Sequence, residues 1–252
     1  GKKCLYEDFG EMMFTHFGVT GPLVLTASTA VLKKLRQKEL RIEIDLKPAL
    51  SEEVWVYAEH TPEKLHNVSG EILGAARGLA ERLGGDVCAV IMGYDVERYA
   101  QELIYQGADK VYVVDDELFR DYNNELYTKA LEKIVREHDP AIMLFGSVFD
   151  RRDLAPRLAA RLGTGIISEC GAVGFDDSGR LTADKVSFGG NYLGHIVFKE
   201  GMRPAIITAR PGVLEGQRSE DRKGEIIKVT PDAGPEDMMT QIKKVAAVAK
   251  KV

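Results

Sequence analysis

The segment DVCAVIMG, residues 86–93, is a nearly continuous run of apolar residues. A strand that is apolar on both sides is typical of a parallel sheet covered by helices on both faces. The preceding residues, SGEILGAARGLAERLGG at 69–85, have apolar positions three and four apart and end in two glycines, which predicts a helix and its stop. Before them, VWVYAEH at 54–60 is a further strand candidate. These residues predict a β-α-β unit.

The same alternation of apolar strands and amphipathic helices continues to about residue 163. Proline disfavours helical geometry in the residue before it, so Asp139 is expected to end a helix. Four such units in succession predict an α/β fold with a mostly parallel sheet. The further strands are expected at 110–116 and 141–148, and the further helices at 96–107, 123–139 and 153–163.

After Gly165 the pattern changes to segments that resemble added antiparallel strands, namely LTADKVSF at 181–188, YLGHIVFK at 192–199 and PAIITARP at 204–211. The polar residues 214–237 are typical of an arm or linker, and an amphipathic segment follows them to the last residue. We therefore expect three parts, with residues 1–52 separate from 53–213 and 214–252.

Composition excludes several classes of function. The net charge is -5 with a pI of about 5.7, which gives no support for nucleic-acid binding. No apolar run approaches the roughly 20 residues of a membrane helix. The three cysteines lie far apart, so we expect free buried thiols rather than disulfides or a zinc site. We expect a cytoplasmic protein without membrane or nucleic-acid partners.

Motifs of catalysis are missing. No G-x-G-x-x-G follows a strand and opens a helix, and neither a Walker A loop, a G-x-S-x-G elbow nor H-E-x-x-H is present. The five histidines are scattered along the chain, and we assign none of them to catalysis. We therefore predict no catalytic residue.

The first candidate site is the loop that carries Arg151, Arg152 and Asp153. It follows an expected strand and opens an expected helix, for which Asp153 is a suitable cap. Phosphates and dinucleotides bind at this position in open parallel sheets. The alternative is that the two arginines form surface ion pairs and that Asp153 is only a cap.

The second candidate site is the turn that contains Gly189, Gly190 and Asn191. Paired glycines allow a ligand or partner to approach the backbone closely, and an asparagine can bond to an amide or a phosphate. A simple turn explains the same residues. Arg210, beside the rigid Pro211, is equally ambiguous.

Taken together, residues 53–252 resemble the electron transfer flavoprotein alpha subunit. The resemblance rests on VWVYAEH, LHNVSGEILGAARGLAERLG, GADKVYVVDD, YTKALEKIVREHDPAIMLFGSV, RDLAPRLAARLGTG, SFGGN and PAIITARPGV, in this order. It implies the family's N-terminal domain, which is related to adenine-nucleotide-binding folds and is not itself the main nucleotide site. It also implies an arm and helix at 214–252 leading to a FAD domain that the chain lacks.

The resemblance further implies an electron carrier that pairs with a beta subunit and serves flavin-dependent dehydrogenases. FAD would be the cofactor, with AMP or a second FAD in the beta subunit. Arg151, Arg152, Asp153, Gly189, Gly190 and Asn191 would then contact cofactor near that interface. The alternative function is a stand-alone nucleotide-binding domain or hydrolase of the same fold class, with its phosphate site at Arg151 to Asp153.

Residues 1–50 resemble an internal segment of the BaiN-like flavin-dependent oxidoreductases. The resemblance rests on YEDFGEMMFTHFGVTGP and IDLKPALS. The nucleotide-binding glycine motif of that family is absent from these residues. We therefore expect them to carry no chemistry and to make few buried contacts.

Overall fold

The computed structural model describes residues 13–15, 18–20, 50–148, 152–187, 190–199 and 201–240. The chain divides into two compact units, residues 1–48 and 49–252. In the first unit, the strands β1 (Met13–Thr15) and β2 (Gly18–Thr20) pair antiparallel. The prediction that residues before 53 make few buried contacts concerns residues that lie largely outside the described ones.

The second unit is built on a seven-stranded sheet in the order β12-β5-β4-β3-β6-β11-β7. Every neighbouring pair of strands in it is parallel, so the α/β fold predicted from the sequence is confirmed. Its strands are β3 (Val54–Tyr57), β4 (Val87–Gly93), β5 (Lys110–Asp115), β6 (Ile142–Gly146), β7 (Ile166–Cys170), β11 (Ala205–Ala209) and β12 (Glu225–Lys228).

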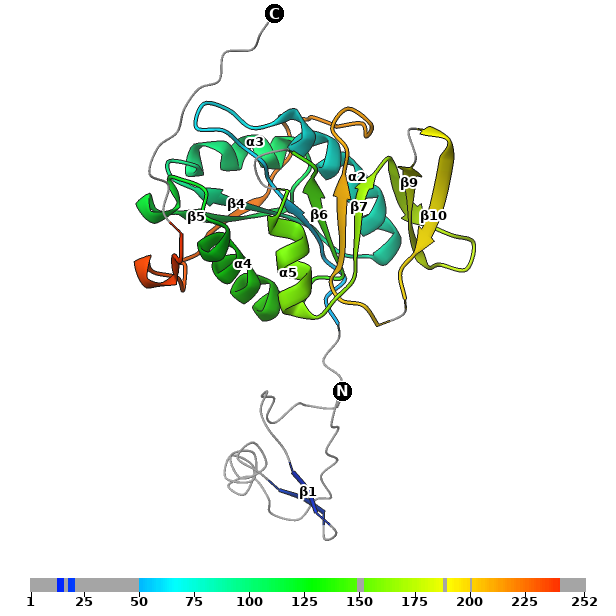
Figure 1. Cartoon of the computed structure of the whole chain (residues 1–252), viewed down its shortest axis with the longest axis horizontal. Coiled ribbons are helices and arrows are strands. Elements are labelled where there is room, and N and C mark those ends of the chain that lie inside the picture. The colour runs from blue at the N-terminus through cyan, green and yellow to red at the C-terminus, as the bar shows by residue number, and fades with distance from the viewer. Residues whose placement is uncertain are drawn as a thin grey trace, which may run out of the picture. The chain divides into compact units, whose positions relative to one another are not determined.

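Helices cover both faces of this sheet (Figure 1). On one face lie α2 (Asn67–Leu83) and α3 (Ala100–Tyr105), and on the other lie α4 (Asn124–His138) and α5 (Leu154–Leu162). Two separate clusters of buried apolar side chains fill these layers. Central strand β4 is buried at all of its positions, as its continuous apolar sequence predicts.

Local signals set the helix ends. Asn123 caps α4 by accepting a hydrogen bond from the backbone N–H of Leu126 at 3.0 Å. Asp139 ends the same helix in the left-handed region at φ 42°, and Gly84 ends α2 at φ 79°. Both ends agree with the stop signals in the sequence. Asp139 does not continue the helix because Pro140 follows it.

A smaller antiparallel sheet has the order β10-β9-β8. Its strands are β8 (Ala172–Phe175), β9 (Leu181–Ser187) and β10 (Tyr192–Val197), and Figure 1 shows β9 and β10 beyond the β7 edge of the main sheet. The antiparallel prediction holds for the LTADKVSF and YLGHIVFK segments. It is wrong for PAIITARP, because β11 lies parallel between β6 and β7. A mostly apolar strand that is buried at every position fits a central parallel strand better than an added antiparallel one.

The sequence analysis did not assign β7, β8 or β12. β12 lies within the polar residues 214–237 and pairs with β5 at the far edge of the sheet from β7. To reach it, the chain crosses α2 in a segment that we call the strap, residues 210–224. The strap packs tightly, since a Cβ atom added at Gly74 of α2 would lie 2.1 Å from the carbonyl oxygen of Glu215.

Cys88 and Cys170 are free and buried, in agreement with the sequence; Cys4 is outside the described residues. Among the helices that the structure describes, none is long and apolar enough to cross a membrane. The expected C-terminal amphipathic helix lies, from residue 241 onward, outside the described residues.

Candidate functional site

The order of the main sheet reverses between β3 and β6, since the chain moves outward from β3 to β5 and then returns to the other side of β3. Ligands of open α/β sheets bind at the carboxyl ends of strands at such a reversal. Here the position is filled by the protein itself. Glu59, just after β3, is 1% exposed, and its Cγ atom lies 3.3 Å from where a Cβ of Gly146 would be.

The start of α2 is also engaged at this point. Ser69 is buried, and its hydroxyl accepts from the N–H of Glu59 at 2.8 Å and donates to the Glu59 carbonyl at 3.0 Å. The strap covers the next turn, where the N–H of Gly212 donates to the Glu71 carboxylate at 2.7 Å. A dinucleotide phosphate would therefore meet a buried acidic side chain and a helix start that is already packed.

A second group of backbone donors, at the carboxyl end of β5, is occupied by a carboxylate. Asp115 accepts hydrogen bonds from the N–H groups of Asp95, Val96 and Glu97 at 2.7, 2.8 and 2.9 Å. Consecutive N–H groups of this kind form an anion site, and the protein supplies the anion. The residues at both positions do not fit the phosphates of FAD.

Polar side chains gather instead at the carboxyl ends of β6, β7 and β11, which we call the carboxyl-edge cluster. The cluster comprises Ser147, Arg152, Ser168, Glu169, Lys185, Thr208 and Arg210. Arg152, from the first candidate loop, forms an ion pair with Glu169 and a long hydrogen bond of 3.5 Å to the Ser147 hydroxyl. Arg151 lies outside the described residues.

Glu169 is held in an unusual backbone conformation. Its φ of 61° lies in the left-handed region, which a non-glycine residue seldom occupies within a strand. The N–H of Glu169 donates to the Thr208 hydroxyl on β11 at 2.9 Å, and the pairing of β7 with β11 shifts register here. Strain of this kind is frequent at functional sites. It directs the Glu169 carboxylate toward Arg152.

Asp153 faces a different group. Its side chain makes no capping bond to α5, so the predicted side-chain cap is wrong. The Oδ1 atom of Asp153 accepts instead from the hydroxyl of Tyr122 at 2.8 Å. The residue holds the position before the helix without satisfying a helix N–H. The physical reason is the helical backbone of Asp153, with φ -85° and ψ -15°, because a capping side chain needs a non-helical backbone at this position.

The second candidate loop joins β9 to β10. Gly190 has φ 100° and begins the return to β10 together with Asn191, while Gly189 lies outside the described residues. The base of this hairpin contacts the carboxyl-edge cluster. Lys185 of β9 donates to the Ser168 hydroxyl at 3.2 Å, and Arg210 donates to the Val186 carbonyl at 3.1 Å.

The structure therefore brings Arg152 and the base of the hairpin to neighbouring strand ends, but not Asp153. Sequence reasoning missed Glu169 and Lys185, which lie in no motif. Arg210 was recognised only as ambiguous. The left-handed backbone of Glu169 could not be predicted from the local sequence, because glycine or asparagine normally occupies such a position.

The outer strand of the small sheet exposes apolar residues. Tyr192 and Leu193 of β10 are 68% and 69% exposed, and Ile196 is 37% exposed. β10 pairs only with β9 among the described strands, so its other edge is open. An apolar edge strand without charged residues on its open side is a site for pairing with another chain.

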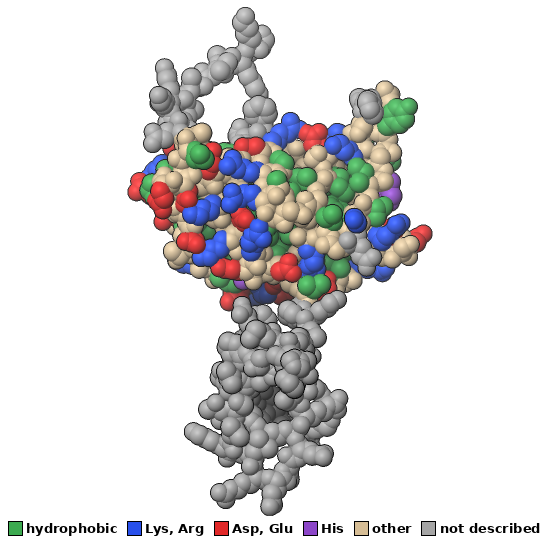
Figure 2. Space-filling model, turned by 60° about the horizontal axis from the view of Figure 1, so that its bottom comes forward, with side chains coloured by type: hydrophobic (Ala, Val, Ile, Leu, Met, Phe, Trp, Pro, Cys, Tyr) green, Lys and Arg blue, Asp and Glu red, His purple; other side chains and the backbone are tan. Residues whose placement is uncertain are grey.

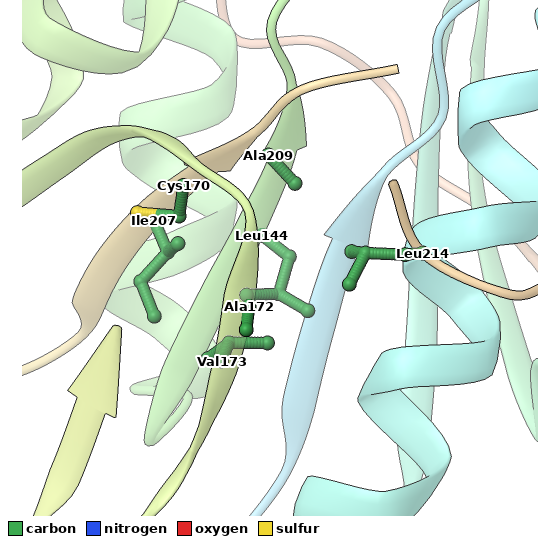
Figure 3. A pocket seen from close by; sticks show the side chains of 7 residues that line it. All are labelled: Leu144, Cys170, Ala172, Val173, Ile207, Ala209 and Leu214. Carbon is green, nitrogen blue, oxygen red and sulfur yellow. The ribbon is translucent and has the colours of Figure 1, made fainter. Parts of the chain in front are cut away.

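Two hollows of the described surface offer no better site. Figure 3 shows an apolar space between β6, β7, β8, β11 and the strap, which is too narrow for a water molecule. A depression of about 370 Å³ over α4 and α5 is lined by charged side chains that pair with one another, such as Arg136 with Glu132 at 2.9 Å. Figure 2 likewise shows basic and acidic side chains intermingled on the face in view.

Comparison with known proteins gives the family. The model of the electron transfer flavoprotein domain matches residues 54–233, which includes the main sheet and the carboxyl-edge cluster. The chain belongs to the electron transfer flavoprotein family. A second family model, the HI0933-like protein barrel and H2TH domain, matches residues 1–81. It agrees with the separate resemblance of the first 50 residues.

The electron transfer flavoprotein alpha subunit of Thermoanaerobacterium thermosaccharolyticum is 41% identical over 201 residues, which cover 79% of this chain and 61% of that protein. The alpha subunit of Clostridium acetobutylicum is 37% identical, with 79% and 60% covered. The acryloyl-CoA reductase electron transfer subunit beta of Anaerotignum propionicum is 28% identical, with 79% and 61% covered. The chain thus spans about 60% of the length of these curated relatives.

Proposed function

We propose that this chain acts as the alpha subunit of an electron transfer flavoprotein, carrying electrons between flavin-dependent dehydrogenases and an acceptor. The observation that carries the proposal is the family match across the α/β unit, together with relatives named as alpha subunits. A flavin would supply the redox chemistry, and the protein would bind and orient it. The chain's own side chains would perform no acid-base catalysis.

The protein itself fills the ligand position at the point where the order of the main sheet reverses. This supports a cofactor that is bound by a complex rather than by this unit alone. Glu59 and Asp115 occupy the two positions where a dinucleotide-binding domain of this class would receive phosphates. We propose that a beta subunit contributes to FAD binding and itself carries AMP or a second FAD. Arg152 and the Gly190–Asn191 turn would then lie against the cofactor at the contact between subunits.

The exposed apolar strand β10 supports a partner chain. Tyr192 and Leu193 are too exposed to contribute to this chain's own core. Buried between two subunits, they would contribute apolar area at about 25 cal/mol per Å² removed from water. Strand β9 connects this surface of β10 to the carboxyl-edge cluster. We therefore place the beta subunit on this side of the unit.

Co-expression with an electron transfer flavoprotein beta subunit tests the proposal. We expect a stable complex in size-exclusion chromatography with flavin absorbance in the peak of the complex. Leu193→Asp should dissociate the complex, while Ile226→Asp, at an exposed position on the opposite edge strand β12, should leave it intact. Stoichiometric FAD on the isolated chain, or no complex at all, would contradict the proposal.

A further inference from the structure

Two half-buried cations of the carboxyl-edge cluster are held by neutral groups alone. The Lys185 ammonium donates to the Ser168 hydroxyl at 3.2 Å, and the Arg210 guanidinium donates to the Val186 carbonyl at 3.1 Å. Neither forms an ion pair within the part of the chain that the structure describes, although ion pairs join most of its other partly buried arginines and lysines to acids. Leaving a cation partly buried without an anion is unfavourable.

The carboxylates closest in the chain are already engaged. Glu169 pairs with Arg152, and Asp184 lies 2.6 Å from the Nδ1 atom of His195 on β10. Asp184 and Lys185 are successive residues of strand β9, so their side chains point to opposite faces of the small sheet. The face that carries Lys185 therefore keeps its positive charge.

Arg210 is hydrogen-bonded to both strands that carry the other two donors, β9 with Lys185 and β7 with Ser168. Arg210 bonds to the carbonyl of Val186, which is the residue after Lys185, and its own N–H donates to the Cys170 carbonyl at 3.0 Å. Burial raises the pKa of the Cys170 thiol to about 11; Lys185 and Arg210 act to lower it, and Asp184 acts to raise it.

We propose that Lys185 and Arg210 bind a phosphate group at the carboxyl ends of β7 and β11, with the Ser168 hydroxyl as a third donor. An arginine fork can engage two phosphate oxygens, and a lysine adds a mobile point charge. Ser168 is exposed, so a ligand can reach the site from solvent. Carboxyl ends of parallel strands are also where α/β proteins receive phosphates.

This site goes beyond the proposed electron-carrier function, because it needs neither flavin nor a beta subunit. It is distinct from the filled sheet reversal at Glu59. The source of the phosphate is either a nucleotide or a free phosphate ion, which share the same chemistry. A nucleotide would add contacts of its sugar and base, whereas the free ion would be held by the three donors alone.

Isothermal titration of the full chain with inorganic phosphate and, separately, with AMP tests the site at low ionic strength. We expect saturable binding that weakens as sodium chloride is added, because charge pairs at a surface are screened. Lys185→Gln and Arg210→Gln should each weaken binding about tenfold or more, since each removes a charge-assisted hydrogen bond. Arg210→Lys should recover part of the loss.

Lys199→Gln serves as the matched control, because Lys199 is exposed and bonds to none of the three donors. It should bind as the parent does. Tighter binding of AMP than of inorganic phosphate identifies a nucleotide as the source, and equal binding identifies the free ion. No saturable binding of either ligand overturns the proposal. Equal binding by the parent and by folded Lys185→Gln, checked by circular dichroism, also overturns it.

Discussion

Glu59 and Ser69 are joined by two hydrogen bonds at the carboxyl end of β3. The Ser69 hydroxyl accepts from the Glu59 N–H at 2.8 Å and donates to the Glu59 carbonyl at 3.0 Å, and both residues are buried. One side chain thus satisfies both backbone groups of the residue that leaves the strand. This arrangement ties the first strand to the first helix and closes the position where a nucleotide would otherwise bind.

Ser69→Ala should lower the free energy of unfolding by about 1–3 kcal/mol, because it leaves the buried Glu59 N–H without a partner, while the Glu59 carbonyl still accepts from the His66 N–H at 2.8 Å. The better helix propensity of alanine offsets only about 0.5 kcal/mol of this loss. Urea unfolding followed by circular dichroism measures it. Ser178→Ala, at an exposed turn position, is the control and should be neutral. Equal loss in the two variants would contradict the role given to Ser69.

Gly74→Ala should displace the strap. The added Cβ would lie 2.1 Å from the Glu215 carbonyl oxygen, whereas a Cβ at Gly78 of the same helix meets nothing within 4 Å. Gly78→Ala should therefore stabilise the protein by about 0.5–1 kcal/mol. Gly74→Ala should destabilise it by about 1–3 kcal/mol despite the same gain in helix propensity. Only Gly74→Ala should also increase the rate of tryptic cleavage within residues 210–224.

Glu53→Gln should remove a stabilisation that depends on pH. Burial opposes ionisation of Glu53, but hydrogen bonds from Lys110 and Trp55 outweigh it and lower the pKa of this carboxyl below 4.5. A carboxyl whose pKa is lower in the folded state than in the unfolded state stabilises the fold at pH values above its unfolded-state pKa. This contribution is lost as the pH falls through the folded-state pKa. The parent should be more stable than the variant by about 1 kcal/mol near neutral pH, because water partly screens a pair whose side chains are not fully buried.

The two stability curves should converge as the pH falls below about 4.5, the ordinary value for a glutamate. Trp55 is the single tryptophan of the chain, and its Nε1 donates to Glu53 at 2.9 Å, so its fluorescence reports unfolding directly. Glu52→Gln, at an exposed neighbour, is the control. A difference that stays constant down to pH 3 would rule out this ion pair as its source.

Glu169→Val should cost about 1–3 kcal/mol more than Glu169→Asn. Both changes remove the ion pair with Arg152, but only asparagine tolerates the left-handed backbone at φ 61°. Thermal unfolding of the two variants therefore isolates the backbone term from the lost charge. Equal stability would show that the strand relaxes once the carboxylate is gone.

The sequence by itself determined the local elements and the class of the fold. The spacing of apolar residues predicted the strand at 86–93 and the helix before it. The helix-end residues Asn123, Asp139 and Gly84 act on groups within one helical turn of their own positions. Such signals are short-range, so they are visible in a string of residues. The burial of β4 follows from the same local pattern.

Only the tertiary structure decided which residues meet. Thr208 supports Glu169 across 39 positions of sequence, and Lys185 reaches Ser168 across 17. No local pattern encodes such contacts, because each depends on which strands become neighbours. The placement of β11 beside β7 creates the first contact, and the position of β9 next to β7 creates the second; β11 was the strand whose pairing the sequence mispredicted. Burial of this mostly apolar strand from both faces stabilises that placement.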